Sequence, residues 1–313
     1  MEDYPQNIME FEAKFNSEES CRDYLYHLRW PNGFQCPHCG NEKSWPVSST
    51  FYQCANCDSK VSVISGTIFH GTHKPLLLWF RAIWWLTGQK NGASALGLMR
   101  ILGLGSYKTA WAWLHKLRRA MVTPGRSKLS GNIEVDETYI GGKKPGKRGR
   151  GAEGKALVVI SVEKIDSTIG RIRLQRVPDA SAESLNCAIK KAVNTGSVIR
   201  TDGWPGYNQL NSLGFIHDVV RQDYEIGENL LPSCHRISSL LKRWLLGTHQ
   251  GAVSHEHLDY YLDEFTFRFN RRKSKHRAKL FYRLLQNAVK VEPVHFDQIV
   301  KNVQKQRNRD HNI

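Results

Sequence analysis

Two pairs of cysteines constrain the fold of this chain more than any other feature of its sequence. Cys36 and Cys39 are separated by two residues, as are Cys54 and Cys57, and 14 residues lie between the pairs. Four thiolates at this spacing suit one tetrahedral Zn²⁺, because each C-x2-C turn can present both of its sulfurs to the same ion. We therefore predict one structural zinc ion per chain, held in a zinc ribbon over residues 30–66.

The alternative interpretation of the two motifs is a redox-active dithiol pair. A thioredoxin-like site needs a βαβ setting, which the sequence around these cysteines does not predict. His38 lies inside the first motif and is a possible replacement for one of the thiolates. The other three of the seven cysteines are scattered, which argues against a disulfide framework and favours a reducing cytoplasm.

The chain is strongly basic. Its 313 residues include 45 Lys and Arg against 29 Asp and Glu, a formal net charge of +16. Such a balance predicts a polyanionic partner, although charge alone does not separate DNA from RNA or an anionic membrane surface. No window approaches 18 uninterrupted apolar residues, so we expect no membrane span, and the acidic first residues lack the apolar run of a signal peptide.

Helices are predicted on both sides of the cysteine-rich module. Residues 8–29 read as a short N-terminal helix, and Leu76–Leu86 is apolar enough to form the core of a helical subdomain within residues 67–125. Ala93–Leu102 and Ser106–Met121 flank a short glycine-containing turn, which is a helix-turn-helix signature, with a plain helical hairpin as the alternative. In the second helix we expect Tyr107, Lys108 and Thr109 to face a DNA groove and Lys116, Arg118 and Arg119 to contact phosphates.

The pattern changes after a predicted linker at residues 123–125, and residues 131–220 hold several β-rich runs. It predicts an α/β domain over residues 126–290, followed by a basic tail over residues 291–313. Helical periodicity is predicted again from about Ser233 to Leu285. The predicted strands are Asn132–Tyr139, Ala156–Val162, Arg171–Val177 and Ser197–Thr201, with a helix over Ala182–Asn194.

Acidic residues on two of these strands are candidate metal ligands. The first strand alternates so that Glu134, Asp136 and Thr138 share one face, while Glu137 lies on the other. An acid on a central strand is unfavourable unless it binds a metal or a cation, which makes Asp136 a candidate, with a solvated edge strand as the alternative. Asp202 ends another strand and precedes a glycine, a typical ligand position, although a turn residue or helix N-cap is the alternative.

A histidine and a lysine on the following helix complete the candidate site. His235 and Lys242 are seven residues apart, which returns to nearly the same helix face two turns later. A metal ligand and a cation able to hold a DNA phosphate would then lie along one side of one helix, whereas an ordinary surface feature is the alternative. If His235 is not a ligand, Glu134 is the next candidate and Glu264 the one after.

A basic glycine-rich run over residues 141–151 is a further candidate for DNA contact. Its glycines would allow close approach to a DNA backbone, and a solvated basic loop is the alternative. The five cations of this run are Lys143, Lys144, Lys147, Arg148 and Arg150.

Several motifs, in this order along nearly the whole chain, resemble one known family. They are RWPNGFQCPHCG at residues 29–40, SGTIF at 65–69, EVDETYIGGK at 134–143, TDGWPGY at 201–207, LLKRWLLGTH at 240–249 and YLDEFTFRFNRR at 261–272. The chain resembles the DDE-type transposases of bacterial insertion sequences that carry an N-terminal zinc ribbon and an ISXO-like catalytic domain.

The resemblance implies a ribonuclease-H-like catalytic domain and metal-dependent cleavage and transfer of DNA strands. The first two acids of the family fall on Asp136 and Asp202, and the family's following lysine falls on Lys242. The third ligand, glutamate in much of the family, is His235 here; because Asn and His also occur among relatives, this implies an Asp–Asp–His–Lys subgroup. Two Mg²⁺ or Mn²⁺ ions would be bridged by Asp136 and flanked by the other two ligands.

The implied partner is double-stranded DNA, both the terminal inverted repeats of the element and the target. We expect a homodimer or larger assembly on DNA and a location at the bacterial nucleoid. Two other functions stay open from the sequence. One is a non-catalytic zinc-ribbon regulator derived from a transposase, which metal-dependent nicking would exclude; the other is a ribonuclease or repair nuclease of the same fold, which strand joining would exclude.

Overall fold

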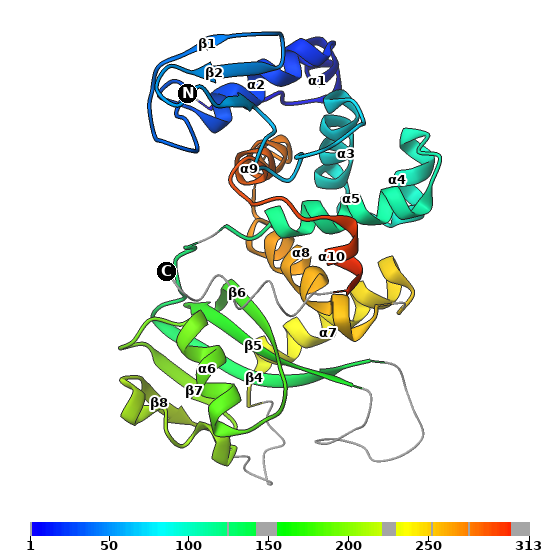
Figure 1. The fold of residues 1–313 in the computed structure, drawn as a ribbon. Helices are drawn as coiled ribbons and strands as arrows, with labels where there is room; N and C mark the ends of the chain where they lie inside the picture. The colour runs from blue at the N-terminus through cyan, green and yellow to red at the C-terminus, as the bar shows by residue number, and fades with distance from the viewer. Residues whose placement is uncertain are drawn as a thin grey trace. The chain divides into compact units, whose positions relative to one another are not determined.

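The computed structural model of the chain describes residues 2–123, 125–141, 155–220, 230–251, 253–274 and 276–301. By its internal contacts the chain divides into two compact units (Figure 1). The first unit is Met1–Thr123 together with Ser274–Ile313, and the second unit is Pro124–Lys273. The predicted boundary at residue 290 differs from this division, because the chain from Ser274 onward belongs to the first unit.

The first unit begins with two short helices and a small sheet. Helices α1 (Ile8–Lys14) and α2 (Glu18–Arg29) replace the single helix predicted over residues 8–29, because the Ser17 hydroxyl caps α2 by accepting from the N–H of Ser20. The antiparallel three-stranded sheet follows, with its strands in chain order. The strands are β1 (Ser44–Pro46), β2 (Phe51–Cys54) and β3 (Lys60–Ser62).

The rest of the first unit is helical, as predicted, and is built around aromatic side chains. Helix α3 (Leu76–Gly88) is largely buried and packs on α9 (Ala278–Ala288). Trp79 of α3 stacks on Trp113 of α5 (Tyr107–Ala120) with 3.8 Å between ring centroids. These two tryptophans are therefore core residues.

Two helices form the predicted hairpin around a glycine turn. Helix α4 (Ala95–Leu102) ends at Gly103, whose φ of +61° is a left-handed conformation that favours glycine. Ser106 occupies the N-cap position of α5, but its side chain makes no capping hydrogen bond. The last helix of this unit, α10 (Phe296–Lys301), contacts α5.

The second unit contains a mixed five-stranded sheet with the order β6-β5-β4-β7-β8. Strands β4, β5 and β6 form an antiparallel meander, while β7 and β8 run parallel to β4. Counted along the chain from β4, the order is 3-2-1-4-5, the ribonuclease-H-like arrangement that was expected. The strands are β4 (Asn132–Ile140), β5 (Ala156–Ile165), β6 (Thr168–Val177), β7 (Val198–Thr201) and β8 (Ile216–Val219).

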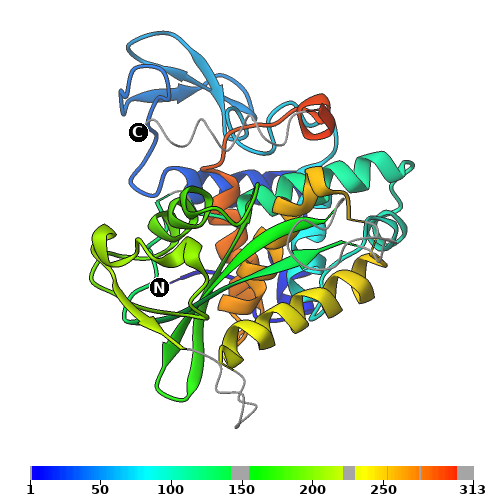
Figure 2. The same ribbon diagram turned by 90° about the horizontal axis from the view of Figure 1, so that it is seen from below.

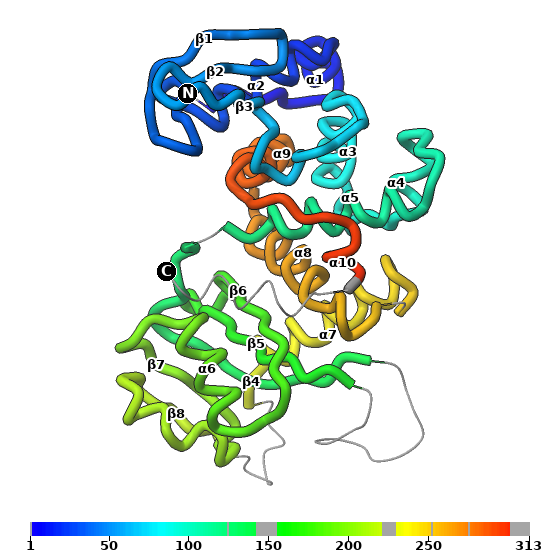
Figure 3. The backbone as a smooth tube through the Cα atoms, viewed as in Figure 1, coloured from blue at the N-terminus to red at the C-terminus, as the bar shows by residue number. Residues whose placement is uncertain are grey.

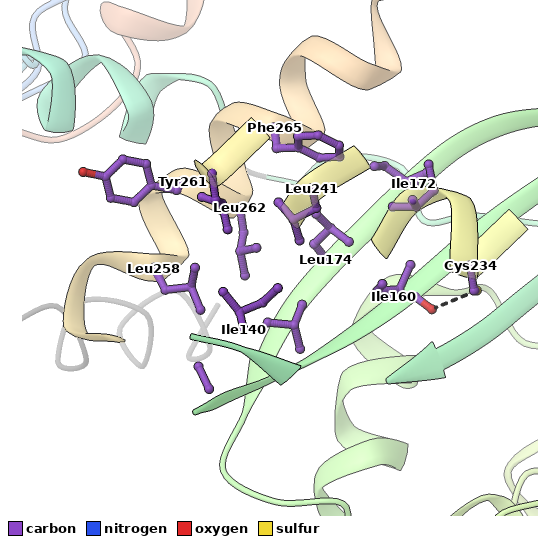
Figure 4. Packing of buried hydrophobic residues seen from close by; sticks show 14 of the residues in the cluster. Ile140, Ile160, Ile172, Leu174, Cys234, Leu241, Leu258, Tyr261, Leu262 and Phe265 are labelled. Carbon is purple, nitrogen blue, oxygen red and sulfur yellow. Dashed lines mark hydrogen bonds between the residues drawn. The ribbon is translucent and has the colours of Figure 1, made fainter. Parts of the chain in front are cut away.

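Helices cover both faces of this sheet (Figures 1 and 2). Helix α6 (Ala182–Ala192) and the short turns η1 (Pro205–Tyr207) and η2 (Asn211–Leu213) pack on one face. Helices α7 (Pro232–His249) and α8 (Leu258–Asn270), joined through η3 (His255–His257), pack on the other, as Figure 4 shows. The tube in Figure 3 traces the same path.

The strand alternation predicted for β4 is confirmed by these two cores. Ile133 and Val135 belong to the cluster on the α6 face, whereas Glu134 and Thr138 bond to α7 on the opposite face. The central strand therefore carries an apolar face and a polar face, and the polar face meets a helix. In the part of the chain that the structure describes, no helix is long and apolar enough to cross a membrane.

Candidate metal centres and DNA-binding surface

The four cysteines of the ribbon come together at one point. Their sulfur atoms all lie within 4.8 Å of one another, with 3.6 Å between Cys36 and Cys57 and 3.5 Å between Cys39 and Cys54. A tetrahedral ion with Zn–S bonds of about 2.3 Å needs sulfurs separated by about 3.8 Å, so the arrangement suits zinc. The cluster does not include His38, which is exposed.

Both cysteine turns have the same backbone form. The N–H of Gly40 donates to the carbonyl of Cys36 at 2.9 Å, and that of Asp58 donates to the carbonyl of Cys54 at 3.2 Å. Gly40 and Asp58 both adopt left-handed φ angles, +74° and +56°. Each turn therefore folds back on itself four residues after its first cysteine, which brings two sulfurs to the same side. The predicted zinc-ribbon-like site is confirmed.

Asp136 lies at the centre of the candidate active site. It sits on the middle strand β4, and its side chain is 18% exposed. Burial raises the pKa of Asp136 to about 6; the neighbouring carboxylate of Glu137 adds to the rise, while the backbone N–H of Glu137 and the imidazole of His235 oppose it. A carboxyl group with such a pKa is short of positive partners, which is the environment that a cation would relieve.

His235 meets Asp136 from helix α7. Its Nε2 atom lies 3.4 Å from Oδ2 of Asp136, and its side chain is 54% exposed. Since the imidazole is open to solvent on one side and next to a carboxylate on the other, it is accessible to an ion bound between them. The structure thus brings together the first acid and the histidine that the sequence placed 99 positions apart.

Asp202 follows the neighbouring parallel strand β7. The strand register pairs Glu134 with Arg200, so Asp136 and Asp202 each lie two residues further along adjacent strands. Asp202 is exposed, and its Oδ1 accepts from the N–H of Trp204 at 3.0 Å, which is the turn geometry named above as the alternative. The parallel register brings Asp202 to the same end of the sheet as Asp136, and the charge of Asp202 adds to the rise in the pKa of Asp136.

Lys242 lies two turns along α7 from His235. Partial burial lowers the pKa of Lys242; the nearby ammonium of Lys155 lowers it further, and the Asp136 carboxylate acts in the opposite direction. Lys242 therefore interacts with both Lys155 and the central acid. Lys155 was not predicted from the sequence, because it is far from Lys242 in the chain and carries no local motif.

Among the described residues, Asp136, Asp202 and His235 do not form a close group of three ligand atoms. Within the described residues, only the four cysteines form a group of three or more ligand atoms that all lie within 4.8 Å of one another. A pair of metal ions about 3.5–4 Å apart needs one shared ligand and separate ligands for each ion, so Asp202 and His235 need not lie close together. The structure brings His235 to 3.4 Å from Asp136, and the parallel strand register brings Asp202 to the same end of the sheet as Asp136.

The two reserve candidates for a third ligand are engaged elsewhere. Glu134 is buried and accepts hydrogen bonds from the backbone of Ser233 and Cys234 in α7. Glu264 is fully buried in α8 and forms an ion pair with Arg268 at 2.8 Å. Both carboxylates are therefore already engaged by partners within the protein. The partner of Glu264 is four residues away on the same helix, whereas the partners of Glu134 lie on another element and are not revealed by strand alternation.

A hydrogen bond on the other face of β4 was not predicted from the sequence. The hydroxyl of Tyr207 donates to Oε2 of Glu137 at 2.6 Å. Tyr207 is buried in η1, five residues after Asp202, and burial followed by the Glu137 charge raises its pKa. The contact ties the segment that carries Asp202 to the strand that carries Asp136. The TDGWPGY motif was the only local sign of it.

The predicted DNA-facing side of α5 is only partly available. Tyr107 and Lys108 are exposed and Thr109 is partly exposed, which is compatible with a role in reading DNA. Lys116 is partly buried, and burial lowers its pKa. The prediction that Arg118 contacts phosphates is wrong, because its side chain is 1% exposed in the core of the first unit.

The five cations of the glycine-rich run lie outside the described residues. They are Lys143, Lys144, Lys147, Arg148 and Arg150.

Comparisons with known proteins agree on the class of protein. Residues 128–270 match a family model described as an ISXO2-like transposase domain, and residues 16–60 match one described as a transposase zinc-ribbon domain. The chain is 28% identical to an uncharacterized protein in transposable element ISH50 of Halobacterium salinarum (strain ATCC 700922 / JCM 11081 / NRC-1). That alignment covers 81% of this chain and 91% of the relative.

Two solved structures show weaker similarity. They are the crystal structure of the Mos1 strand transfer complex and that of a pre-cleavage Mos1 transpososome, 15% and 14% identical to this chain. Each covers 72% of this chain, and the chain covers 77% and 78% of them, with TM-scores of 0.28 and 0.27.

Proposed function

The chain belongs to the ISXO2-like DDE transposases with an N-terminal zinc ribbon, and we propose that it binds the ends of an insertion sequence and cuts and joins DNA there. The observation that carries the proposal is the pairing of Asp136 with His235 at 3.4 Å on the polar face of β4. Its relative in transposable element ISH50 supports a role in a mobile element. No observation in the described residues favours a non-catalytic regulator or another nuclease.

We propose that Asp136, Asp202 and His235 hold two divalent cations, Mg²⁺ or Mn²⁺. When bound, the ions would supply Lewis acidity for an in-line displacement at a DNA phosphate. The chain's own residues orient the reaction: Asp136 lies centrally on a rigid strand, while Asp202 and His235 approach it from separate elements. Neutral imidazole in place of a carboxylate leaves the site less negative than an all-acidic site.

The basic residues around this centre would hold the DNA. Lys242 lies close enough to both Asp136 and Lys155 for their charges to interact, and a phosphate is the anion that would satisfy both lysines. Lys143, Lys144, Lys147, Arg148 and Arg150 follow the strand that carries Asp136 and are proposed to contact the DNA backbone. A homodimer or larger assembly on DNA stays a prediction.

The first unit would recognise the element ends. We propose that the four cysteines hold one structural Zn²⁺, since their sulfur spacing suits a tetrahedral ion. Helix α5 would read DNA through Tyr107, Lys108 and Thr109, with Lys116 contributing charge. The proposed parts are residues 1–29 and 30–66 for the helices and ribbon, 67–125 for the helix-turn-helix region, 126–290 for catalysis and 291–313 for the tail.

Strand joining tests the proposed function. Purified full-length protein is incubated with Mg²⁺ or Mn²⁺, labelled duplex carrying the ends of its element, and a supercoiled target plasmid. We expect end-labelled strands covalently joined to the plasmid, which a simple nuclease does not produce. Metal-dependent cutting without joining would point to a nuclease, and binding without cutting would point to a regulator.

A further inference from the structure

Helix α7 begins against a carboxylate that belongs to another element. Glu134 lies two residues before Asp136 on the same face of β4, and its side chain is 5% exposed. Its Oε2 accepts from the N–H of Ser233 at 2.8 Å and of Cys234 at 3.2 Å, and its Oε1 accepts from the Ser233 hydroxyl at 3.0 Å. Lys164 lies 3.6 Å away and balances the buried charge.

The helix has no cap of its own at this end. Leu231 holds the N-cap position without a side-chain hydrogen bond, and Pro232 has no N–H to satisfy. The next two N–H groups have no acceptor within a helix, and His235 is the first whose N–H donates inside it, to Leu231 at 3.0 Å. Glu134 therefore caps α7 from the neighbouring strand, with its negative charge at the positive end of the helix dipole.

A second contact holds the helix one turn further on. The hydroxyls of Thr138 and Ser238 lie 2.9 Å apart, and Thr138 is on the same face of β4 as Glu134 and Asp136. Between these two contacts, Asp136 faces His235 at 3.4 Å. Alternate residues of the strand thus meet the first two turns of the helix, and the outer two contacts fix the height and orientation of the middle one.

We propose that Glu134 is a positioning residue for the metal centre, which acts by capping α7 so that the His235 imidazole stays against Asp136. Glu134 is not a catalytic residue, because its carboxylate accepts its hydrogen bonds from Ser233 and Cys234 at the start of α7. The inference rests on the proposed ligand role of His235. It explains why the EVDET motif carries an acid two positions before the metal-binding one.

The affinity of the full-length, zinc-loaded chain for Mn²⁺ tests the proposal, with free Mn²⁺ followed by electron paramagnetic resonance. Glu134→Gln keeps the size of the side chain but removes its charge, and we expect Mn²⁺ affinity to fall roughly tenfold, as for other outer-shell partners of metal ligands. His235→Ala should also weaken binding. The double variant should bind no more weakly than His235→Ala alone, because Glu134 acts through that histidine.

Glu163→Gln is the matched control. Glu163 is a buried glutamate on the adjacent strand β5 that accepts from the N–H of Ser130 at 3.2 Å and pairs with Arg171 at 2.7 Å. Its loss removes a buried, hydrogen-bonded charge from the same sheet without touching α7. We expect the control variant to lose stability and to keep wild-type Mn²⁺ affinity.

Amide hydrogen exchange gives a readout that does not depend on metal. In the wild type we expect slow exchange at Ser233 and Cys234, and in Glu134→Gln fast exchange there with the later turns of α7 unchanged. Fast exchange of both amides in the wild type would overturn the proposal even if the variant failed to fold.

Different results would overturn the positioning role of Glu134 and the proposed ligand role of His235. Unchanged Mn²⁺ affinity in Glu134→Gln, or an equal loss with and without His235, overturns the positioning role while the ligand set stands. Unchanged Mn²⁺ affinity and DNA cleavage in His235→Ala overturn the proposed ligand set, and the positioning role with it.

Discussion

Three acids within four positions of β4 have three different surroundings. Glu134 is satisfied by the start of α7, and Glu137 accepts from the Tyr207 hydroxyl on the opposite face. Asp136 accepts one backbone N–H and otherwise faces an imidazole, and burial raises its pKa to about 6. Of these three acids, Asp136 is therefore the one whose negative charge a bound cation would stabilise most.

The raised pKa predicts how pH affects the metal-free protein. An aspartate ionises near pH 3.8 when unfolded but near 6 in this fold, so the unfolded state binds fewer protons between those values and stability falls as pH rises through them. Above about pH 6, the ionised Asp136 lowers the free energy of unfolding by a constant amount of roughly 3 kcal/mol. Asp136→Asn should remove this effect.

Thermal unfolding of the second unit, measured from pH 4 to 7 without added Mg²⁺ or Mn²⁺, checks this prediction. The stability of Asp136→Asn relative to wild type should increase across that window, and added Mn²⁺ should stabilise only the wild type. A difference between the two proteins that does not vary with pH would show that Asp136 ionises normally.

The imidazole of His235 should make the site prefer Mn²⁺ to Mg²⁺. Mg²⁺ favours oxygen ligands, whereas imidazole suits later transition metals and tolerates Mn²⁺. Wild-type cleavage should therefore be faster with Mn²⁺ than with Mg²⁺ at equal low concentration, and His235→Glu should shift the preference toward Mg²⁺. Titration of both ions against both proteins measures it, and identical metal curves for the two proteins would remove His235 from the site.

Secondary-structure elements were predictable where their periodicity is local. Strand β4 and helix α6 lie where alternation and helical spacing placed them, and the apolar run of α3 is buried as expected. Strand β8 was not predicted, since its IHDV segment has no alternating apolar pattern. It is an edge strand that pairs only with β7. The break between α1 and α2 was also missed, because a single capping serine ends the common periodicity.

Side-chain roles that depend on tertiary partners were less predictable. Asp136, Asp202 and His235 could be proposed from motifs and strand ends, and the structure brings the first two near one another and the first and third into contact. The cap that Glu134 provides joins residues 99 positions apart, so no local pattern signals it. Arg118 was misjudged for the same reason, since helical position alone did not reveal that its side chain is buried.

We expect the exposed Lys108 of helix α5 to contribute to DNA binding. Lys108→Ala should weaken duplex binding and reduce the slope of log affinity against log salt by about one, as expected for one lost phosphate contact. Lys290→Ala, an exposed lysine of the same unit beyond α9, is the control and should leave the slope unchanged. Fluorescence anisotropy over a salt series measures both, and equal slopes for Lys108→Ala and wild type would exclude α5 from the interface.

The whole molecule combines a strongly basic chain with two candidate metal centres, one per unit. The sulfur cluster lies in the first unit and the Asp136 centre in the second, so their losses should have different consequences. Cys54→Ser should release zinc, unfold the ribbon and weaken recognition of the element ends, while the second unit keeps its thermal transition.

Zinc content, calorimetry and end binding of Cys54→Ser measure this separation, with the exposed Cys187→Ser as a control that should retain one zinc per chain. A wild-type protein that binds no zinc under reducing, zinc-replete conditions would contradict the assignment. Loss of both thermal transitions in Cys54→Ser would contradict the independence of the two units.

If DNA is cut at the centre formed by Asp136, Asp202 and His235, loss of either acid should stop cleavage. Cleavage of a labelled element end in Mn²⁺ is measured for the wild type and for Asp136→Ala and Asp202→Ala, with folding checked by circular dichroism. We predict metal-dependent cutting by the wild type and no detectable cutting by either folded variant. Cutting at the wild-type rate by either variant would contradict the claim.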